Sequence, residues 1–239
     1  MPEARGFCRT KAAARLVVML CSPQPPEGSI IETDQTLTRE VTLFMNISVL
    51  LFDGFEALDA FGPVEVFSKA GGWNIGFYSF TGGIVTCAQG IKVQTEPFSS
   101  ADKSGVLLVP GGMGTRRLVG DAAFLEQLKS AADKASYCLS VCTGSALLAR
   151  CGVLDGRHAT SNKRAMTWVK EQGPDVLWEN RARWVADGKF FTSSGISAGI
   201  DMALDFVRAR LGEPAALEIA ERMEYLWNSE STNDPYARD

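Results

Sequence analysis

From residue 45 onward, short runs of β-branched and apolar residues alternate with segments of helical periodicity, and this alternation limits the fold more than any other feature. A hairpin is expected at 183–192, turning on Asp187-Gly188. Other strands are expected at 46–52, 73–80, 106–109 and 136–141, with a pair of short strands within 84–95. Helices are expected at 56–70, 121–135, 146–150, 164–172, 197–211 and 214–227. Strands separated by helices predict an α/β fold with a mainly parallel central sheet and helices on both faces.

One domain is expected over residues 45–230, because a chain of 239 residues with 46% hydrophobic residues can bury one large core. Within the segment 56–70, Pro63 is tolerated only near a helix start, so that helix is expected to begin around Gly62. Residues 231–239 are expected to form a C-terminal tail.

Residues 1–44 are expected to be an N-terminal extension that packs loosely. Basic residues precede a short apolar run at 16–21, and three prolines follow it at 23, 25 and 26. This basic, acid-poor composition partly matches an organelle transit peptide, whereas a secretory signal would need a longer apolar core. Met45 as the functional start is an alternative, because regular structure is expected to begin there. A cytoplasmic location is favoured over organelle targeting.

Composition and charge exclude several classes of function. The formal net charge is −4, and no stretch combines clustered basic residues with aromatic ones, so no nucleic-acid partner is expected. No apolar run approaches the roughly 18 residues that span a bilayer, so no integral membrane segment is expected. The six cysteines include no C-x-x-C pair, and His158 is the only histidine. We therefore predict reduced thiols, with no metal site and no disulfide framework.

The expected strand at 136–141 runs straight into Cys142-Thr143-Gly144 and a helix, the arrangement of a nucleophile elbow. Such a turn holds the side chain of Cys142 at the helix N-terminus, where the helix dipole and nearby amides lower a thiol pKa. A thiolate is the nucleophilic form of cysteine. Position alone leaves the alternative of an ordinary buried cysteine open.

Three candidate site segments follow expected parallel strands, and ligands bind at the carboxyl ends of such strands. Asp59 follows the first strand, Gly111-Gly112 the strand at 106–109, and Cys142 the strand at 136–141. Taken alone, Asp59 could instead cap a helix, Gly111-Gly112 could simply end a strand, and Thr143 could cap the helix after the elbow.

Together, Cys142-Thr143-Gly144, Pro110-Gly111-Gly112 and the segment 58–63 (LDAFGP) resemble the ThiJ/PfpI superfamily, most closely its isocyanide (isonitrile) hydratase-like members. The stretch 192–201 also resembles that group's segment beside the active site. The resemblance covers nearly everything from Met45 to the last expected helix and implies a flavodoxin-like three-layer sandwich.

The resemblance also implies roles for individual residues. Cys142 would be the nucleophile and Asp59 its acidic partner, with a carboxyl pushed towards its protonated form by burial and by a neighbouring negative charge. Thr143 would orient substrate or water with its hydroxyl. Gly111 and Gly112 would supply amides for developing negative charge, and Gly195 and Ile196 would border the substrate. A small-molecule substrate, no metal or organic cofactor, and a homodimer are implied, with the first helix or the Trp184 hairpin as the alternative interfaces.

Two departures from related patterns bear on the reaction. The glyoxalase-like and protease-like branches usually place a histidine after the elbow cysteine, where this chain has Thr143, and His158 is expected on an exposed turn. The segment 160–163 is TSNK, where isocyanide hydratases tend to have Thr-Thr-His-Trp.

The leading hypothesis is cysteine-dependent hydration of an isocyanide to an N-substituted formamide. The alternatives are a reactive-carbonyl enzyme of the glyoxalase or deglycase kind and a non-enzymatic redox sensor or ligand-binding protein, in which Cys142 is oxidised. A regulator with a further DNA-binding module is not expected, because few residues follow Trp227.

Overall fold

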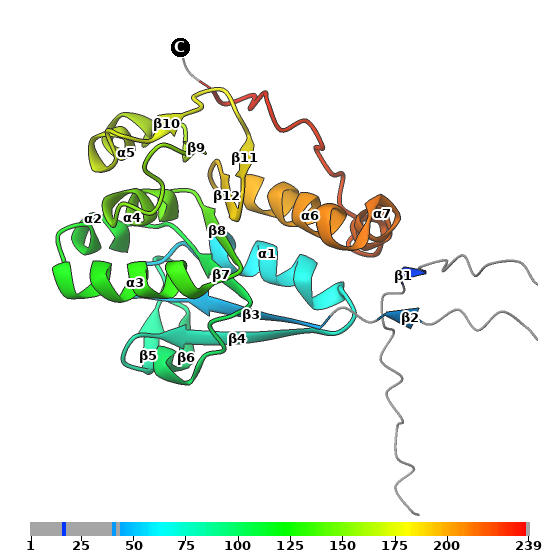
Figure 1. Cartoon of the computed structure of the whole chain (residues 1–239), viewed down its shortest axis with the longest axis horizontal. Helices are drawn as coiled ribbons and strands as arrows, with labels where there is room; N and C mark the ends of the chain where they lie inside the picture. Colours follow the sequence, from blue (N-terminus) through cyan, green and yellow to red (C-terminus); the bar gives the residue numbers. More distant parts are fainter. Residues whose placement is uncertain (1–15, 18–39, 42–43, 238–239) are drawn as a thin grey trace, which may run out of the picture.

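The computed structural model describes residues 16–17, 40–41 and 44–237. In the described part of the chain, eight strands form one sheet in the order β11-β12-β8-β7-β3-β4-β6-β5 (Figure 1). The pairs from β12 through β8, β7, β3 and β4 to β6 are parallel, and only the outer pairs β11 with β12 and β5 with β6 are antiparallel. The expected α/β fold, flavodoxin-like with a mostly parallel sheet, is confirmed.

The strands of the sheet agree closely with the apolar runs of the sequence. They are β3 (Met45–Leu50), β4 (Trp73–Ser79), β5 (Gly83–Thr86), β6 (Lys92–Pro97), β7 (Val106–Val109), β8 (Tyr137–Val141), β11 (Trp184–Asp187) and β12 (Phe190–Ser193). Two further pairs lie outside the sheet: β1 (Leu16–Val17) with β2 (Glu40–Val41), and β9 (His158–Ala159) with β10 (Leu177–Trp178).

The helices cover the sheet in two groups (Figure 1). One group comprises α1 (Ala57–Lys69), α6 (Ala198–Leu211) and α7 (Glu213–Arg222). The other comprises α2 (Gly114–Leu118), α3 (Ala122–Lys134), α4 (Gly144–Arg150) and α5 (Met166–Gln172). A one-turn helix, η1 (Phe98–Ser100), follows β6. No helix in the described ranges is both long and apolar enough to cross a bilayer.

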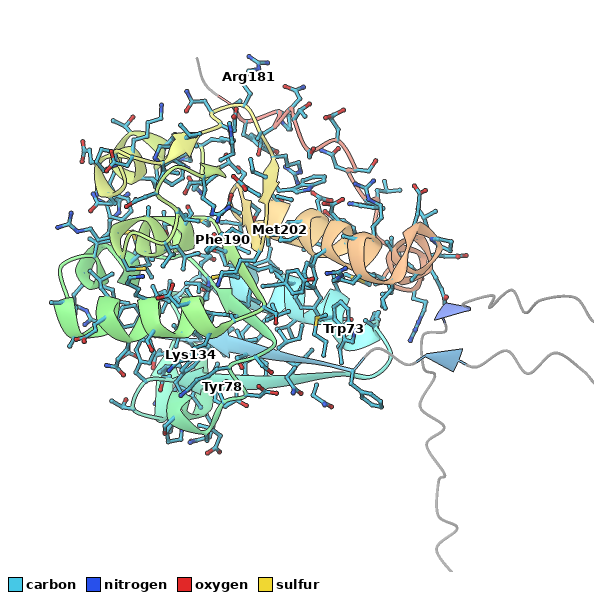
Figure 2. All side chains as sticks on the ribbon, viewed as in Figure 1. Trp73, Tyr78, Lys134, Arg181, Phe190 and Met202 are labelled. Carbon is cyan, nitrogen blue, oxygen red and sulfur yellow. The ribbon has the colours of Figure 1, made fainter. Side chains whose placement is uncertain are left out.

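The core lies between the sheet and its helices. Figure 2 shows Trp73, at the start of β4, and Met202, of α6, among the side chains that fill this space; both are buried. Phe206 of α6 lies between Trp73 and Phe191, with ring centroids 5.8 Å and 5.1 Å away. Because the parallel strands are buried on both faces, β7 consists entirely of buried residues.

The chain reverses its direction across the sheet at β3, which lies between β4 and β7. From β3 the chain builds outwards through α1 to β4, and later returns on the other side to form β7 and β8. A crevice forms at the carboxyl ends of the strands at such a switch point. The loops after β3, β7 and β8 therefore meet there.

Two expected helix boundaries are wrong. The first helix begins at Ala57, five residues before Gly62, and so contains Pro63 in its interior. Pro63 cannot donate to the carbonyl of Asp59, and a proline inside a helix costs about 3 kcal/mol, which tertiary packing must offset. The close contact between α1 and α6 provides such packing: a Cβ on Gly62 would lie 2.9 Å from the Ile200 side chain.

The last helix ends at Arg222 and does not continue to Trp227. Glu224 adopts a left-handed backbone with φ 50°, which stops helical propagation. The amide of Tyr225 then donates to the carbonyl of Ala220 at 3.0 Å, closing the helix end. The following segment returns to the main domain: the Arg183 amide donates to the carbonyl of Ser231 at 2.7 Å.

Almost all of residues 1–44 lie outside the described residues. The expectations of loose packing and targeting for this segment, and of reduced thiols at Cys8 and Cys21, therefore stay predictions.

Candidate functional site

The elbow between β8 and α4 holds Cys142 in a strained backbone conformation. Its φ is 57°, in the left-handed region that costs a residue with a Cβ about 1–2 kcal/mol. Neighbouring segments hold this geometry: the Cys142 carbonyl accepts from the hydroxyls of Ser161 (2.8 Å) and Ser145 (3.1 Å). The Cys142 amide donates to the carbonyl of Ser193 at 3.1 Å. A strained residue fixed from several sides at a strand end is typical of a functional site.

Asp59 reaches the same place from the first turn of α1 and is fully buried. Its Oδ2 accepts from the Gly111 amide at 3.0 Å, whereas Oδ1 is buried and accepts from none of the described residues. Asp59 lies inside the helix and does not cap it, since Glu56 occupies the N-cap position. Oδ1 is therefore the oxygen available to hold and deliver a proton.

Burial favours the protonated form of both partners of the Asp59–Cys142 pair. Burial raises the pKa of Asp59 to about 8, with a smaller contribution from the charge of Glu56. Burial first, and the Asp59 carboxylate second, raise the pKa of the Cys142 thiol above its ordinary value. This direction is opposite to the one expected from the helix N-terminus alone, although the Thr143 amide does favour the thiolate. The desolvation of Cys142, a residue that is 6% exposed, outweighs the helix contribution.

Asn162 is a site residue that was not among the candidates predicted from the sequence. Its Nδ2 donates to Cys142 Sγ at 3.2 Å. Its Oδ1 accepts from the amides of Arg164 (2.9 Å) and Ala165 (3.2 Å), so the amide group is oriented and Nδ2 must face the sulfur. Asn162 belongs to the segment 160–163, where the sequence TSNK differs from the Thr-Thr-His-Trp of isocyanide hydratases. However, the four residues alone could not show that the Asn162 side chain touches the sulfur.

Thr143, Gly111 and Gly112 lie around the pair, but their polar groups already have partners. The Gly112 amide donates to Thr143 Oγ1 at 3.0 Å, and Thr115 Oγ1 lies 3.1 Å from the same oxygen. Thr143 makes no capping bond to α4. A Cβ on Gly111 would lie 2.5 Å from the Thr143 amide nitrogen, so only glycine fits there. A developing anion would have to compete with Asp59 and Thr143 for the amides of Gly111 and Gly112.

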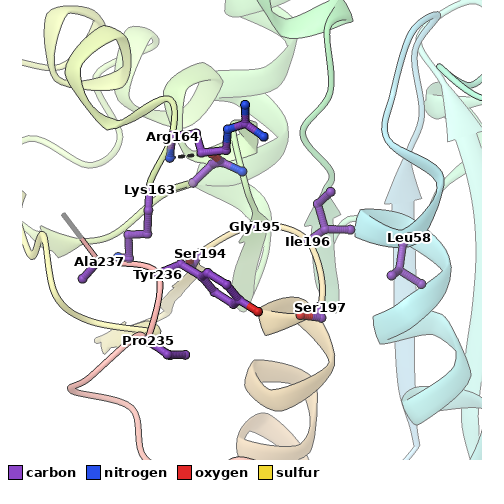
Figure 3. A pocket seen from close by; sticks show the side chains of 11 residues that line it. Leu58, Lys163, Arg164, Ser194, Gly195, Ile196, Ser197, Pro235, Tyr236 and Ala237 are labelled. Carbon is purple, nitrogen blue, oxygen red and sulfur yellow. Dashed lines mark hydrogen bonds between the residues drawn. The ribbon is translucent and has the colours of Figure 1, made fainter.

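A cavity of about 780 Å³ opens next to residues that border the sulfur; Cys142 itself is not among its lining residues. Gly195 and Ile196 line it, as do Leu58, next to Asp59, and Asn162. A Cβ on Gly195 would lie 3.2 Å from Cys142 Sγ, so this glycine borders both the sulfur and the cavity. The remaining lining residues are Lys163, Arg164, Ser194, Ser197, Pro235, Tyr236 and Ala237 (Figure 3).

The other sequence-level candidates lie apart from this site. His158 is exposed, and its Nδ1 lies 2.8 Å from Glu179 Oε1. The described cysteines (Cys87, Cys138, Cys142 and Cys151) are all free thiols. Among the described residues, no group of three or more His, Cys, Asp or Glu side chains could hold a metal ion.

Fold and site together define an α/β protein in which an elbow cysteine faces a buried carboxyl group at the carboxyl edge of a parallel sheet. The chain belongs to the DJ-1/PfpI family, whose model matches residues 45–209.

Relatives in this family differ in what they do. The chain is 32% identical to an isonitrile hydratase of Pseudomonas putida over 182 residues, which are 76% of this chain and 78% of that protein. It is 31% identical to the HTH-type transcriptional regulator CdhR of Pseudomonas aeruginosa over 72% of this chain, but it spans only 53% of that regulator. Family membership thus covers both enzymes and regulators.

Solved structures agree with the fold. A ThiJ/PfpI family protein from Pseudomonas syringae superposes with a TM-score of 0.67 at 29% identity, over 76% of this chain and 75% of that chain. DJ-1beta of Drosophila melanogaster superposes with a TM-score of 0.66 at 21% identity, over 77% of this chain and all of that chain, a likeness of fold.

Proposed function

We propose that this protein hydrates an isocyanide to an N-substituted formamide, with Cys142 as the nucleophile and Asp59 as the proton carrier. The observation that carries the proposal is the pair itself: a buried thiol facing a carboxyl group whose pKa is raised to about 8. The resemblance to a protein named isonitrile hydratase supports this reaction over other uses of the pair.

The first step adds the thiol across the terminal carbon of the isocyanide R–N≡C. Asp59 gives its proton to that carbon while the bond between sulfur and carbon forms, and the thiol proton passes to the Asp59 carboxylate. The product is a thioimidate, Cys142–S–CH=N–R, and Asp59 is again protonated. Because the proton and the sulfur add together, the step needs no stable thiolate, which agrees with the raised pKa of the thiol.

The second step adds water to the thioimidate carbon. Asp59 protonates the nitrogen and accepts a proton from the water, giving Cys142–S–CH(OH)–NH–R. The carbon–sulfur bond then breaks, and the hydroxyl proton returns through Asp59 to the sulfur. The formamide R–NH–CHO leaves, and the thiol and the acid are restored. The overall change is the addition of one water to one isocyanide.

Two fixed donors favour negative charge on the sulfur during these steps. Asn162 Nδ2 lies 3.2 Å from Sγ, and the Thr143 amide lowers the cost of the thiolate. Donors that are oriented before the reaction stabilise developing charge without reorganising. Unlike a histidine, the Asn162 amide cannot exchange protons at neutral pH, so proton transfer falls to Asp59.

Steady-state hydration of benzyl isocyanide, followed as the formamide by chromatography, tests the proposal. We expect turnover by the wild type, none by Cys142→Ala, and a loss of at least about 100-fold in Asp59→Asn, the usual scale for a general acid. Cys151→Ala, which removes a partly buried thiol at the C-cap of α4, is the matched control. Turnover retained by Cys142→Ala would overturn the proposal. The absence of turnover in the wild type would also overturn the proposal. Assays with reactive carbonyls and tests of Cys142 oxidation would then follow.

A further inference from the structure

The cavity beside Cys142 has one wall that comes from a distant part of the chain. Its other walls come from α1, the loop after β9 and the loop before α6, whereas Pro235, Tyr236 and Ala237 come from the segment 231–237, which we name the C-terminal strap. Figure 3 shows the Tyr236 ring pointing towards the start of α6, with Leu58 on the opposite side of the cavity. Tyr236 is 71% exposed, so its ring is accessible to a bound molecule.

A buried carboxylate anchors the strap. Asp234 is 2% exposed, and its Oδ2 lies 3.7 Å from Nη1 of the buried Arg183. Its Oδ1 accepts from the amide of Tyr236 at 2.8 Å, which fixes the backbone of the residue that lines the cavity. The Asp234 amide in turn donates to the carbonyl of Arg181 at 2.7 Å. The strap is thus held by side chain and backbone alike.

The Asp234–Arg183 ion pair also connects the strap to α6, the helix that follows the cavity residues 194–197. Arg183 Nη2 also pairs with Oδ2 of Asp201 at 2.5 Å, and Asp201 lies in the first turn of α6, directly after the cavity residues 194–197. The positive charge of Arg183 is therefore shared by two buried carboxylates. Removing one member of such a buried cluster leaves a charge without its partner, so the arrangement is expected to hold the strap in a single position.

We infer that Tyr236 determines which isocyanide substituents the site prefers, and that aromatic substituents are favoured; this inference rests on the proposed function. In R–N≡C the reacting carbon lies at the sulfur, and the linear group directs R away from it. The cavity beside Gly195 and Asn162 is the space that receives R. Its apolar side chains are those of Leu58, Ile196, Pro235, Tyr236 and Ala237, and the Tyr236 ring can stack on an aromatic R.

Kinetics with benzyl and methyl isocyanide test the inference. An aromatic pair contributes enough to change affinity about tenfold, so Tyr236→Ala should lower the benzyl-to-methyl ratio of kcat/KM about tenfold, mainly through the KM for the benzyl substrate. Tyr236→Phe should restore the preference, because the ring remains. Leu226→Ala, which truncates a side chain that is 96% exposed and outside the cavity lining, is the matched control. An unchanged ratio in Tyr236→Ala would overturn the inference.

A second measurement does not depend on hydratase activity. N-benzylmaleimide and N-methylmaleimide alkylate the same sulfur, and peptide mass mapping reports the rate at Cys142 apart from the other thiols. We expect Tyr236→Ala to lower the benzyl-to-methyl rate ratio severalfold, and Asp234→Asn to lower it in the same direction by loosening the strap. If the wild type turns over no isocyanide but Tyr236→Ala lowers this ratio, the proposed hydration is wrong, whereas the assignment of Tyr236 to the wall of the substrate cavity stands. Equal ratios in the wild type and Tyr236→Ala would refute the wall assignment.

Discussion

Asn162→Asp is a substitution that removes the fixed donor from the Cys142 sulfur while keeping the shape of the side chain. The new carboxylate can still accept from the amides of Arg164 and Ala165, as Asn162 Oδ1 does. The atom that lies 3.2 Å from Sγ, however, changes from an N–H donor to an oxygen. The variant therefore separates the bond to sulfur from the bonds that order the loop.

The expected magnitude follows from the lost hydrogen bond. A bond to a charged group contributes about 1.5–3 kcal/mol, and one pKa unit corresponds to about 1.4 kcal/mol. The thiol pKa should rise by at least about one unit, and repulsion between the new carboxylate and the thiolate adds to the rise. At a pH below the thiol pKa, the thiolate fraction and the alkylation rate should fall about tenfold or more.

Alkylation of Cys142 by iodoacetamide, followed by peptide mass between pH 7 and 11, measures this change. Asn180→Asp, which introduces the same charge at an exposed asparagine, is the matched control and should alkylate as the wild type does. If Asn162→Asp and the wild type share one rate profile, the Asn162 amide does not stabilise the thiolate and the reasoning fails.

Three other variants test the strain, the carboxyl group and the glycine of the site. Cys142→Gly should be about 1 kcal/mol more stable to urea than Cys142→Ala, because glycine adopts φ 57° without steric cost; equal stabilities would show that the elbow is not strained. Asp59→Asn should gain stability over the wild type as pH rises from about 4 to 8. The raised pKa of Asp59, about 8 against an ordinary 3.8, makes the wild type bind more protons when folded than when unfolded, so wild-type stability falls through that window by about 1.4 kcal/mol per unit. Urea unfolding at pH 5 and pH 8 checks this, and a pH-independent difference contradicts it. Gly195→Ala should slow alkylation of Cys142 about tenfold or more, since its Cβ would lie 2.1 Å from Asn162 Nδ2 and displace the donor; a wild-type rate would refute that contact. Light scattering should give twice the mass of one chain if the homodimer that the family resemblance implies is formed, and a single-chain mass would rule it out.

Much of the fold could be predicted because its signals are local. The apolar run 106–109 coincides with β7, and Asp121, expected at a helix start, caps α3 by accepting from the Phe124 amide at 3.0 Å. Each of these patterns involves residues within a few positions of one another. The helix around Pro63 was placed wrongly because packing against α6 offsets a local penalty that the sequence shows plainly.

Part of the site could be predicted for a related reason. Residues that follow parallel strands gather at one edge of the sheet, and this brought Asp59, Gly111 and Cys142 together. The hydrogen-bond partners of their polar atoms could not be predicted in this way. The amides of Gly111 and Gly112 face Asp59 and Thr143, a detail that depends on side-chain geometry to a fraction of an ångström.

By itself, the sequence determined the α/β fold and the elbow at Cys142, since backbone periodicity and strand order are enough to place them, whereas the pairing of Cys142 with Asp59 was predicted from the motifs that resemble the ThiJ/PfpI superfamily. Only the tertiary structure decided three things: that burial raises the thiol pKa, that Asn162 donates to the sulfur, and that the segment 231–237 walls the cavity. Desolvation depends on every atom around the sulfur, and the two contacts join segments that are distant along the chain. Local sequence patterns therefore cannot predict these properties.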